Sequence, residues 1–266
     1  MNIPLSTEVC GADFGDARLS KRHGVLVDRL AERPEASLPS ALSSAELEAA
    51  YRFINHEGVT LPTLVAPHLK QVAERCAGRP DIIVAHDTSE IEYSGAARKG
   101  LGRLRSKGQG FYLHAALAIG GSQVRDPLGL IALRALVRGP KRPKQRATRR
   151  RCAADRESLR WTEQIQEVEQ RLGQGRALHV GDRETDAYEL FVDCIRIGAR
   201  FVFRMAHDRR IAGEEDGTTK LEQRLRGVEG VAVREVKLHA RGKALAPSAA
   251  KMECPEFCVR AGGLAT

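Results

Sequence analysis

Five short apolar runs, separated by polar segments, constrain the fold of this chain more than any other sequence feature. They are DIIVAHD (81–87), GFYLHAALAIGG (110–121), LGLIALRALVRGP (128–140), ALHVG (177–181) and RFVFRM (200–205). Short runs of this kind are typical of buried strands. The first three predict an antiparallel meander, and a helical pattern precedes each of the last two. The order β-β-β-α-β-α-β therefore predicts an α/β fold with a mixed sheet and helices on its faces.

Helical patterns occupy residues 1–75, before the first predicted strand. The segment DARLSKRHGVLVDRLAERP predicts a helix that stops at Pro34. Ser43, followed three residues later by Glu46, predicts a capping box at the start of a second helix. Further helices are expected at about Thr63 to Cys76, at about Ala153 to Leu172 and in DAYELFVDCIRIG (186–198). Glu184 and Asp186 are expected in the first turn of the last helix, where negative charge suits the helix dipole.

The charge balance indicates a polyanionic partner. The formal net charge is +9 and the pI is about 9.5, which is typical of nucleic-acid-binding proteins but is also compatible with a basic enzyme. Residues 134–151 contain nine Lys or Arg and no acidic residue, which predicts an exposed cationic loop. Six scattered cysteines form no CxxC pair, so free thiols in a reducing cytoplasm are expected. Neither a signal pattern nor an apolar run of about 18 residues is present, and a cytoplasmic protein without membrane contact is expected.

Two aspartates stand where predicted strands end. Asp87 closes the first run and Asp182 follows the fourth, and such strands can be neighbours in a mixed sheet. Their carboxylates would then share one crevice, where oxygen ligands suit Mg²⁺. The alternative is that each aspartate caps the turn or helix that follows it. Three histidines near the same strand ends are expected to be satisfied, half-buried residues more often than metal ligands: His86, His179 and His207.

Two further segments have an open interpretation. RKGLGRLRSKGQG (98–110) predicts a basic hairpin that is either solvated or in contact with a DNA backbone, through Arg103, Arg105 and Lys107. Beyond Met205 a charged loop, a short helix and the strand VAVREVKL (231–238) are expected. From residue 239 to 266 the strand pattern is lost.

Five stretches together resemble a known family. They are FGDARLSKRHGVLVDRLAERP (14–34), AAYRFINHEGVT (49–60), HDTSEIEYSG (86–95), HVGDRETDAYELF (179–191) and RFVFRMAHDRR (200–210). Each is weak alone, but their order and spacing resemble the bacterial cut-and-paste DDE transposases of the IS-four type.

The resemblance implies a ribonuclease H-like mixed sheet with flanking helices, preceded by a small helical domain. It implies a DNA-end-binding domain at residues 1–78, a partial catalytic core at 79–210 and the start of a β-rich insertion or an irregular tail at 211–266. It further implies two Mg²⁺ or Mn²⁺ ions, and a homodimer on double-stranded transposon ends and target DNA. The metal-binding catalytic residues would be Asp87 and Asp182. The DNA contacts would be Arg18, Lys21, Arg22, Arg204, Arg209 and Arg210. From its position alone, Arg183 is a further candidate that either contacts phosphate or pairs with Glu184 or Asp186.

One departure from the family pattern limits the expected activity. The family's third carboxylate lies in a Tyr-x-x-Arg-x-x-x-Glu pattern, which does not occur after Asp182. A frameshift or early stop inside the insertion is the hypothesis, and a catalytically weak or inactive transposase is expected. One alternative is a non-catalytic protein that binds DNA ends and inhibits a full-length transposase. Another is a ribonuclease H-like nuclease with Glu184 or Asp186 as the third acid.

Overall fold

The computed structural model describes residues 4–121, 125–139, 159–212, 218–226, 232–237 and 249–254. The chain divides into two compact units, Met1–Arg204 and Met205–Thr266, and each is described by itself. The expected cationic loop beyond residue 139 and the expected start of the long helix at Ala153 lie outside the described residues.

The first unit begins with helices. Capping boxes fix the N-termini of two of these helices. Ser43 and Glu46 form the expected one, and Thr60 and Thr63 form a second. The Asp16 side chain caps the first long helix by accepting from the Arg18 N–H. The elements are η1 (Leu5–Val9), α1 (Ala17–Glu32), α2 (Leu38–Ala41), α3 (Ser44–Ile54) and α4 (Leu61–Ala77).

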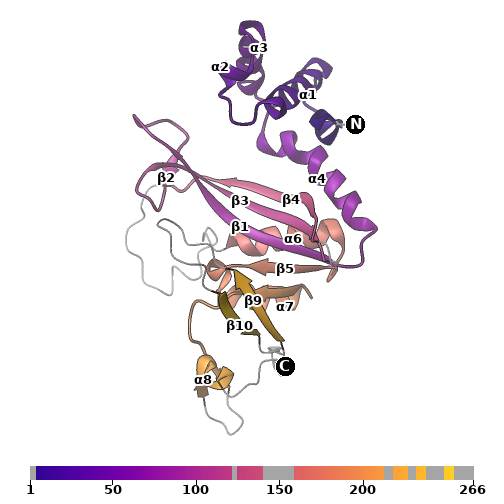
Figure 1. Cartoon of the computed structure of the whole chain (residues 1–266). Helices are drawn as coiled ribbons and strands as arrows, with labels where there is room; N and C mark the ends of the chain where they lie inside the picture. Colours follow the sequence, from indigo (N-terminus) through magenta and orange to yellow (C-terminus); the bar gives the residue numbers. More distant parts are fainter. Residues whose placement is uncertain are drawn as a thin grey trace. The chain divides into compact units, whose positions relative to one another are not determined.

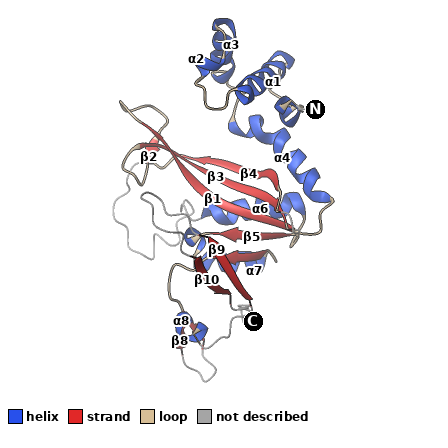
Figure 2. Cartoon of the chain, in the orientation of Figure 1, coloured by secondary structure: helices blue, strands red, loops and turns tan. Residues whose placement is uncertain are grey.

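A six-stranded mixed sheet follows these helices (Figures 1 and 2). Its strands are β1 (Ile82–Tyr93), β2 (Gly102–Arg103), β3 (Gln109–Gly120), β4 (Pro127–Leu136), β5 (Ala177–Gly181) and β6 (Arg200–Phe203). The order is β2-β3-β1-β5-β6, and β4 also pairs with β3. The meander β1, β3 and β4 is antiparallel, whereas β5 pairs with β1 and β6 in parallel. The expected mixed sheet and the expected adjacency of the first and fourth predicted strands are both confirmed.

Helices α6 (Leu159–Leu172) and α7 (Tyr188–Arg196) complete the first unit, with a 3₁₀ turn, η2 (Arg183–Thr185), between β5 and α7. Helices α4 and α6 pack on one face of the sheet, where Val72 and Val168 meet Val84 and Ala118. Helix α7 packs against α6 and β6 over the same face. The N-terminal helices have a core of their own around Phe14 and Phe53. Among the described residues, no helix is long and apolar enough to cross a membrane.

The second unit contains two short antiparallel pairs. Strand β7 (Arg210–Ala212) pairs with β8 (Thr218–Lys220), which leads into α8 (Leu221–Leu225). Strand β9 (Ala232–Lys237) confirms the expected VAVREVKL strand and pairs with β10 (Ala249–Cys254). The expected loss of strand pattern after residue 239 was therefore wrong for 249–254, where Ala250, Met252 and Cys254 alternate with Lys251 and Glu253 as in a strand.

Candidate functional site

Asp87 and Asp182 lie side by side at one edge of the parallel part of the sheet. His86 pairs with Gly181 as the last register pair of β1 and β5, and each aspartate comes next in its chain. Neighbouring strands are about 5 Å apart, so the two aspartates follow the strands at that separation. Both side chains are exposed. The strand pairing thus brings together the two residues that the sequence singled out.

The second expected role for an aspartate, a cap, also holds at Asp182. Its Oδ1 accepts from the Glu184 N–H at 2.9 Å, and its carbonyl accepts from the Thr185 hydroxyl at 2.6 Å. A Cβ at Gly181 would collide with the Thr185 side chain, so this tight turn requires glycine. Capping therefore orients the Asp182 carboxylate at the end of β5.

Glu184 and Asp186 were expected in the first turn of the next helix, and this was wrong. Glu184 lies in η2 and Asp186 ends it, whereas α7 begins only at Tyr188. The cause is local, because the Asp182 cap closes a separate 3₁₀ turn first.

Glu184 is held between two arginines. Arg105 from the β2–β3 loop and Arg160 from α6 both pair with its carboxylate. Hydrogen bonding from Arg105 is the largest cause that lowers the pKa of Glu184. A carboxylate engaged in this way is a poor third metal ligand, and no group of three potential metal ligands occurs among the described residues. Both observations weigh against the nuclease alternative that uses Glu184.

Directly before the two aspartates, buried polar side chains link β1, β5 and α6. His86 Nδ1 lies 2.8 Å from Gln164 Oε1, and His86 Nε2 lies 2.9 Å from His179 Nδ1. His179 Nε2 lies 2.9 Å from Glu169 Oε1, and the Gln164 amide donates to the His114 carbonyl. The expectation that His86 and His179 are satisfied residues is thus confirmed, although both are fully buried and not half-buried. His207 is an exposed residue of the second unit.

The hydrogen-bond pattern fixes the number of protons in this network. The His114 carbonyl can only accept a hydrogen bond, so the Gln164 amide nitrogen faces it. The amide oxygen of Gln164 then faces His86, and His86 Nδ1 must carry a hydrogen to donate to it. One hydrogen must then lie between His86 and His179, and another between His179 and Glu169. Two neutral imidazoles supply only two of these three hydrogens. Burial raises the pKa of Glu169 and lowers those of His86 and His179 to about 4, which assigns the third hydrogen to Glu169.

His114 holds the main chain of Asp87. Its Nδ1 lies 3.1 Å from the Asp87 carbonyl and 2.9 Å from the Thr88 hydroxyl, so this nitrogen carries the hydrogen. The ring stands edge-on to Trp161, with the centroids 4.4 Å apart. Burial lowers the pKa of His114 to about 3. A neutral imidazole therefore fixes the backbone that carries the first aspartate.

Sequence reasoning missed the α6 residues of this network. Gln164 and Glu169 lie on the inward face of α6, next to Ile165 and Val168. The available signal was that Gln164 and Glu169 share the apolar face of a predicted helix, although an amide and a carboxyl are polar. Histidines on the neighbouring strands could have been expected as their partners.

The expected DNA contacts lie on several elements. Arg18 and Lys21 are exposed on α1, and Arg22 is half-buried there. Around the β1–β3 connection, Arg103, Arg105 and Lys107 are exposed, and only Arg105 reaches the turn after Asp182. The others are Arg183, exposed in η2, Arg204, exposed after β6, and Arg209 and Arg210 in the second unit.

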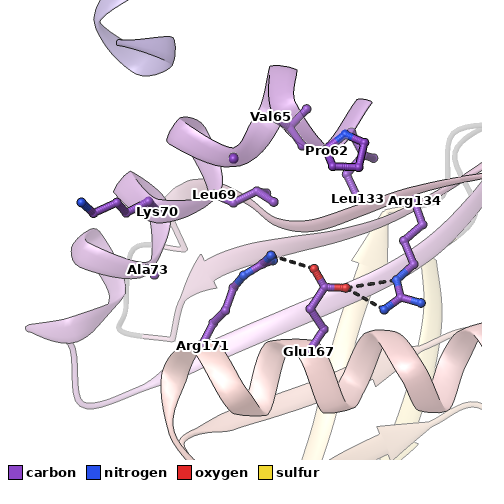
Figure 3. Close-up of a pocket in the computed structure, with 10 residues that line it drawn as sticks. Pro62, Val65, Leu69, Lys70, Ala73, Leu133, Arg134, Glu167 and Arg171 are labelled. Carbon is purple, nitrogen blue, oxygen red and sulfur yellow. Dashed lines mark hydrogen bonds and ion pairs between the residues drawn. The ribbon is translucent and has the colours of Figure 1, made fainter. Parts of the chain in front are cut away.

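A hollow of about 500 Å³ lies between α4, β4 and α6, away from the aspartates (Figure 3). Leu69 and Leu133 contribute apolar walls. Glu167 pairs with both Arg134 and Arg171 (Figure 3). Arg134 also pairs with Glu163, so both arginines are already engaged in ion pairs. The hollow is therefore not the candidate active site.

The fold is α/β, with N-terminal helices followed by a mixed sheet, and two aspartates follow adjacent parallel strands. Within this frame, residues 5–59 match the family model of the transposase DNA-binding domain. The matched segment covers η1, α1, α2 and α3 and contains Arg18, Lys21 and Arg22. The match supports a DNA-binding role of the transposase type, with DNA as a partner.

Proposed function

We propose that the chain acts in cut-and-paste DNA transposition as a DDE transposase similar to the IS-four type. One observation carries the proposal. Residues 5–59 match the transposase DNA-binding domain and belong to the same compact unit as the mixed sheet. In that sheet, Asp87 and Asp182 come directly after His86 and Gly181, which pair across β1 and β5. We propose residues 1–78 as the DNA-end-binding domain, 79–210 as the catalytic core and 211–266 as the start of an insertion or a tail.

A ribonuclease H-like core is the fold that we propose for the sheet. In support, an antiparallel meander β4-β3-β1 continues into parallel β5 and β6, each preceded by a helix. In such a core the strand that begins the meander lies beside the first strand after it, and β1 and β5 are placed in this way.

The proposed cofactor is Mg²⁺ or Mn²⁺, two ions per site, held in part by Asp87 and Asp182. Two exposed carboxylates after adjacent strands fit these ions, which commonly take one or two carboxylates together with water and substrate phosphates. The bound ions would activate water and stabilise the leaving oxygen in phosphodiester cleavage. Two carboxylates without a third should hold them weakly, so we propose that the chain has little or no strand-transfer activity.

Removal of either aspartate should weaken the binding of divalent ions. Asp87→Asn and Asp182→Asn are expected to weaken Mn²⁺ affinity at least about tenfold, since even outer-shell partners of metal sites contribute 10–100-fold. Isothermal titration with Mn²⁺, with and without duplex DNA, measures this. Asp81→Asn is the matched control, because Asp81 is an exposed aspartate at the opposite end of β1. Equal Mn²⁺ affinity in all three variants would remove the aspartates from the proposed site.

Basic residues of α1 are proposed to contact the phosphates of transposon ends. Lys21→Ala and Arg18→Ala are expected to weaken binding across all DNA sequences and to reduce the salt slope by about 1 for each lost contact. Fluorescence anisotropy between 50 and 200 mM salt measures the slope. Arg196→Ala, which removes an exposed arginine of α7, is the control and should leave the slope unchanged. Unchanged slopes in the α1 variants would contradict the assignment.

The second candidate function is a non-catalytic DNA-end-binding protein that opposes an active transposase. The observation that favours it is the match of residues 5–59 to a DNA-binding domain, together with a site to which the described residues contribute Asp87 and Asp182 but no third ligand. Both functions require a gel shift with DNA, but only the first requires metal-dependent nicking. A homodimer on paired ends is part of both proposals, and sedimentation of the DNA complex tests it.

A further inference from the structure

Strands β1 and β3 continue past the aspartates as a ribbon. Strand β1 pairs with β5 only over 82–86, whereas its pairing with β3 continues to Tyr93 and Gln109 (Figure 1). Side chains alternate along a strand, so Asp87 and Tyr93, six residues apart, point to the same face. At a rise of about 3.3 Å per residue, they lie roughly 20 Å apart along it. The far end of the ribbon is thus within reach of any DNA that contacts Asp87.

An aromatic cluster occupies this face at the ribbon's end. The rings of Tyr93 and Phe111 lie 6.2 Å apart at an angle of 32°. The Arg98 guanidinium lies over the Tyr93 ring, 5.6 Å from its centroid. Tyr93 remains 38% exposed. A half-buried ring therefore supports an exposed ring, and an exposed arginine covers the stack.

The loop that carries Arg98 is held in place by one side chain. The Gln109 amide nitrogen donates to the carbonyls of Gly95 and Ala96, at 3.1 and 2.7 Å. Its oxygen accepts from the Arg98 N–H at 2.9 Å. Three hydrogen bonds from one residue of β3 thus fix the loop and the position of Arg98 above Tyr93.

Positive charge surrounds this cluster. Four exposed basic residues lie around the β1–β3 connection: Arg98, Lys99, Arg103 and Lys107. The carboxylates nearest to them in sequence are Glu90 and Glu92. Aromatic faces next to backbone-tracking cations are the common means of binding single-stranded nucleic acid, because bases stack on the rings whatever their identity. Guanidinium groups add stacking and cation–π contacts. Paired bases in an intact duplex do not offer their faces in this way.

We propose that Tyr93, Phe111 and Arg98 form a stacking platform for unpaired bases of DNA, on the face of β1 that carries Asp87 and roughly 20 Å along the strand from it. The preferred substrate would then be a duplex with a frayed or single-stranded extension and not a blunt duplex. This inference rests on the proposed function and adds the substrate class.

The test is fluorescence anisotropy with the full chain and no divalent ion, on three labelled probes of arbitrary sequence. The probes are a blunt duplex, the same duplex with a dT extension, and dT single strand. The wild-type protein should bind the extended duplex roughly tenfold more tightly than the blunt one. Tyr93→Leu should remove this preference and leave blunt-duplex binding unchanged, whereas Tyr93→Phe should keep it.

Two further variants sharpen the test. Arg98→Lys keeps the charge but loses the planar group, so it should reduce the preference without changing the salt slope on blunt duplex. Tyr188→Leu removes another exposed tyrosine, 66% exposed on α7, and should have no effect. Equal binding of blunt and extended duplex by the wild type would contradict the stacking platform but not the proposed function. Failure to bind any probe would instead contradict the proposed function.

Discussion

Glu169→Ala is expected to lower the free energy of unfolding by about 3 kcal/mol, whereas Glu169→Gln should lower it by less than about 1 kcal/mol. The alanine leaves a cavity and removes the partners of His179 Nε2 and of the Gly175 N–H, both in a buried setting. The glutamine amide can donate to His179 and accept from Gly175, as a protonated Glu169 does. The two substitutions therefore distinguish a protonated Glu169 from an ionised Glu169.

Urea denaturation at pH 7 with an unchanged m-value measures both effects. Glu163→Ala is the matched control on the same helix, because Glu163 is exposed and forms a surface ion pair with Arg134. It should change the stability by no more than about 0.5 kcal/mol. If Glu169→Gln destabilises as strongly as Glu169→Ala, the carboxyl is ionised and the assignment of the third hydrogen is wrong.

Local signals account for the part of the fold that the sequence predicted. The Ser43–Glu46 capping box lies within four residues, and the apolar runs that became β1, β3, β4, β5 and β6 are each continuous. The pairing of β1 with β5 followed from their order, because a strand after a meander and a helix commonly lies beside the meander's first strand. This pairing also brought Asp87 and Asp182 together.

Two misses were local, because the Asp182 side chain caps η2 before α7 can start and the alternation within residues 250–254 was overlooked. Contacts between distant residues account for the rest. Glu184 resembles an ordinary helix-start acid in the sequence, and only the fold brings Arg105, 79 residues away, to its carboxylate. The same holds for Gln164 and His86, which are 78 residues apart. Such partners have no local signature.

Acidification from pH 7 to pH 5 is expected to lower the free energy of unfolding by several kcal/mol. Burial lowers the pKa of His86 and His179 to about 4 and that of His114 to about 3, against 6.5 in the unfolded chain. Between these values the unfolded chain binds protons that the folded chain does not, so stability falls as the pH falls. Each imidazole contributes up to about 2 kcal/mol at pH 5, at 1.36 kcal/mol per pKa unit.

Glu169 has the opposite effect on the pH dependence of stability. Burial raises its pKa, so the folded chain binds this proton at a higher pH than the unfolded chain does. Glu169→Gln should therefore make the loss between pH 7 and pH 5 steeper. Burial also lowers the pKa of His23, whose ring stacks on Phe53 with Phe14 at its edge, so His23→Phe should make the loss shallower. His56→Gln, at an exposed histidine, is the control. Urea midpoints at pH 7, 6 and 5 measure all four proteins. A stability that changes with pH in neither the wild type nor Glu169→Gln would show that folding does not lower the pKa values of the buried imidazoles.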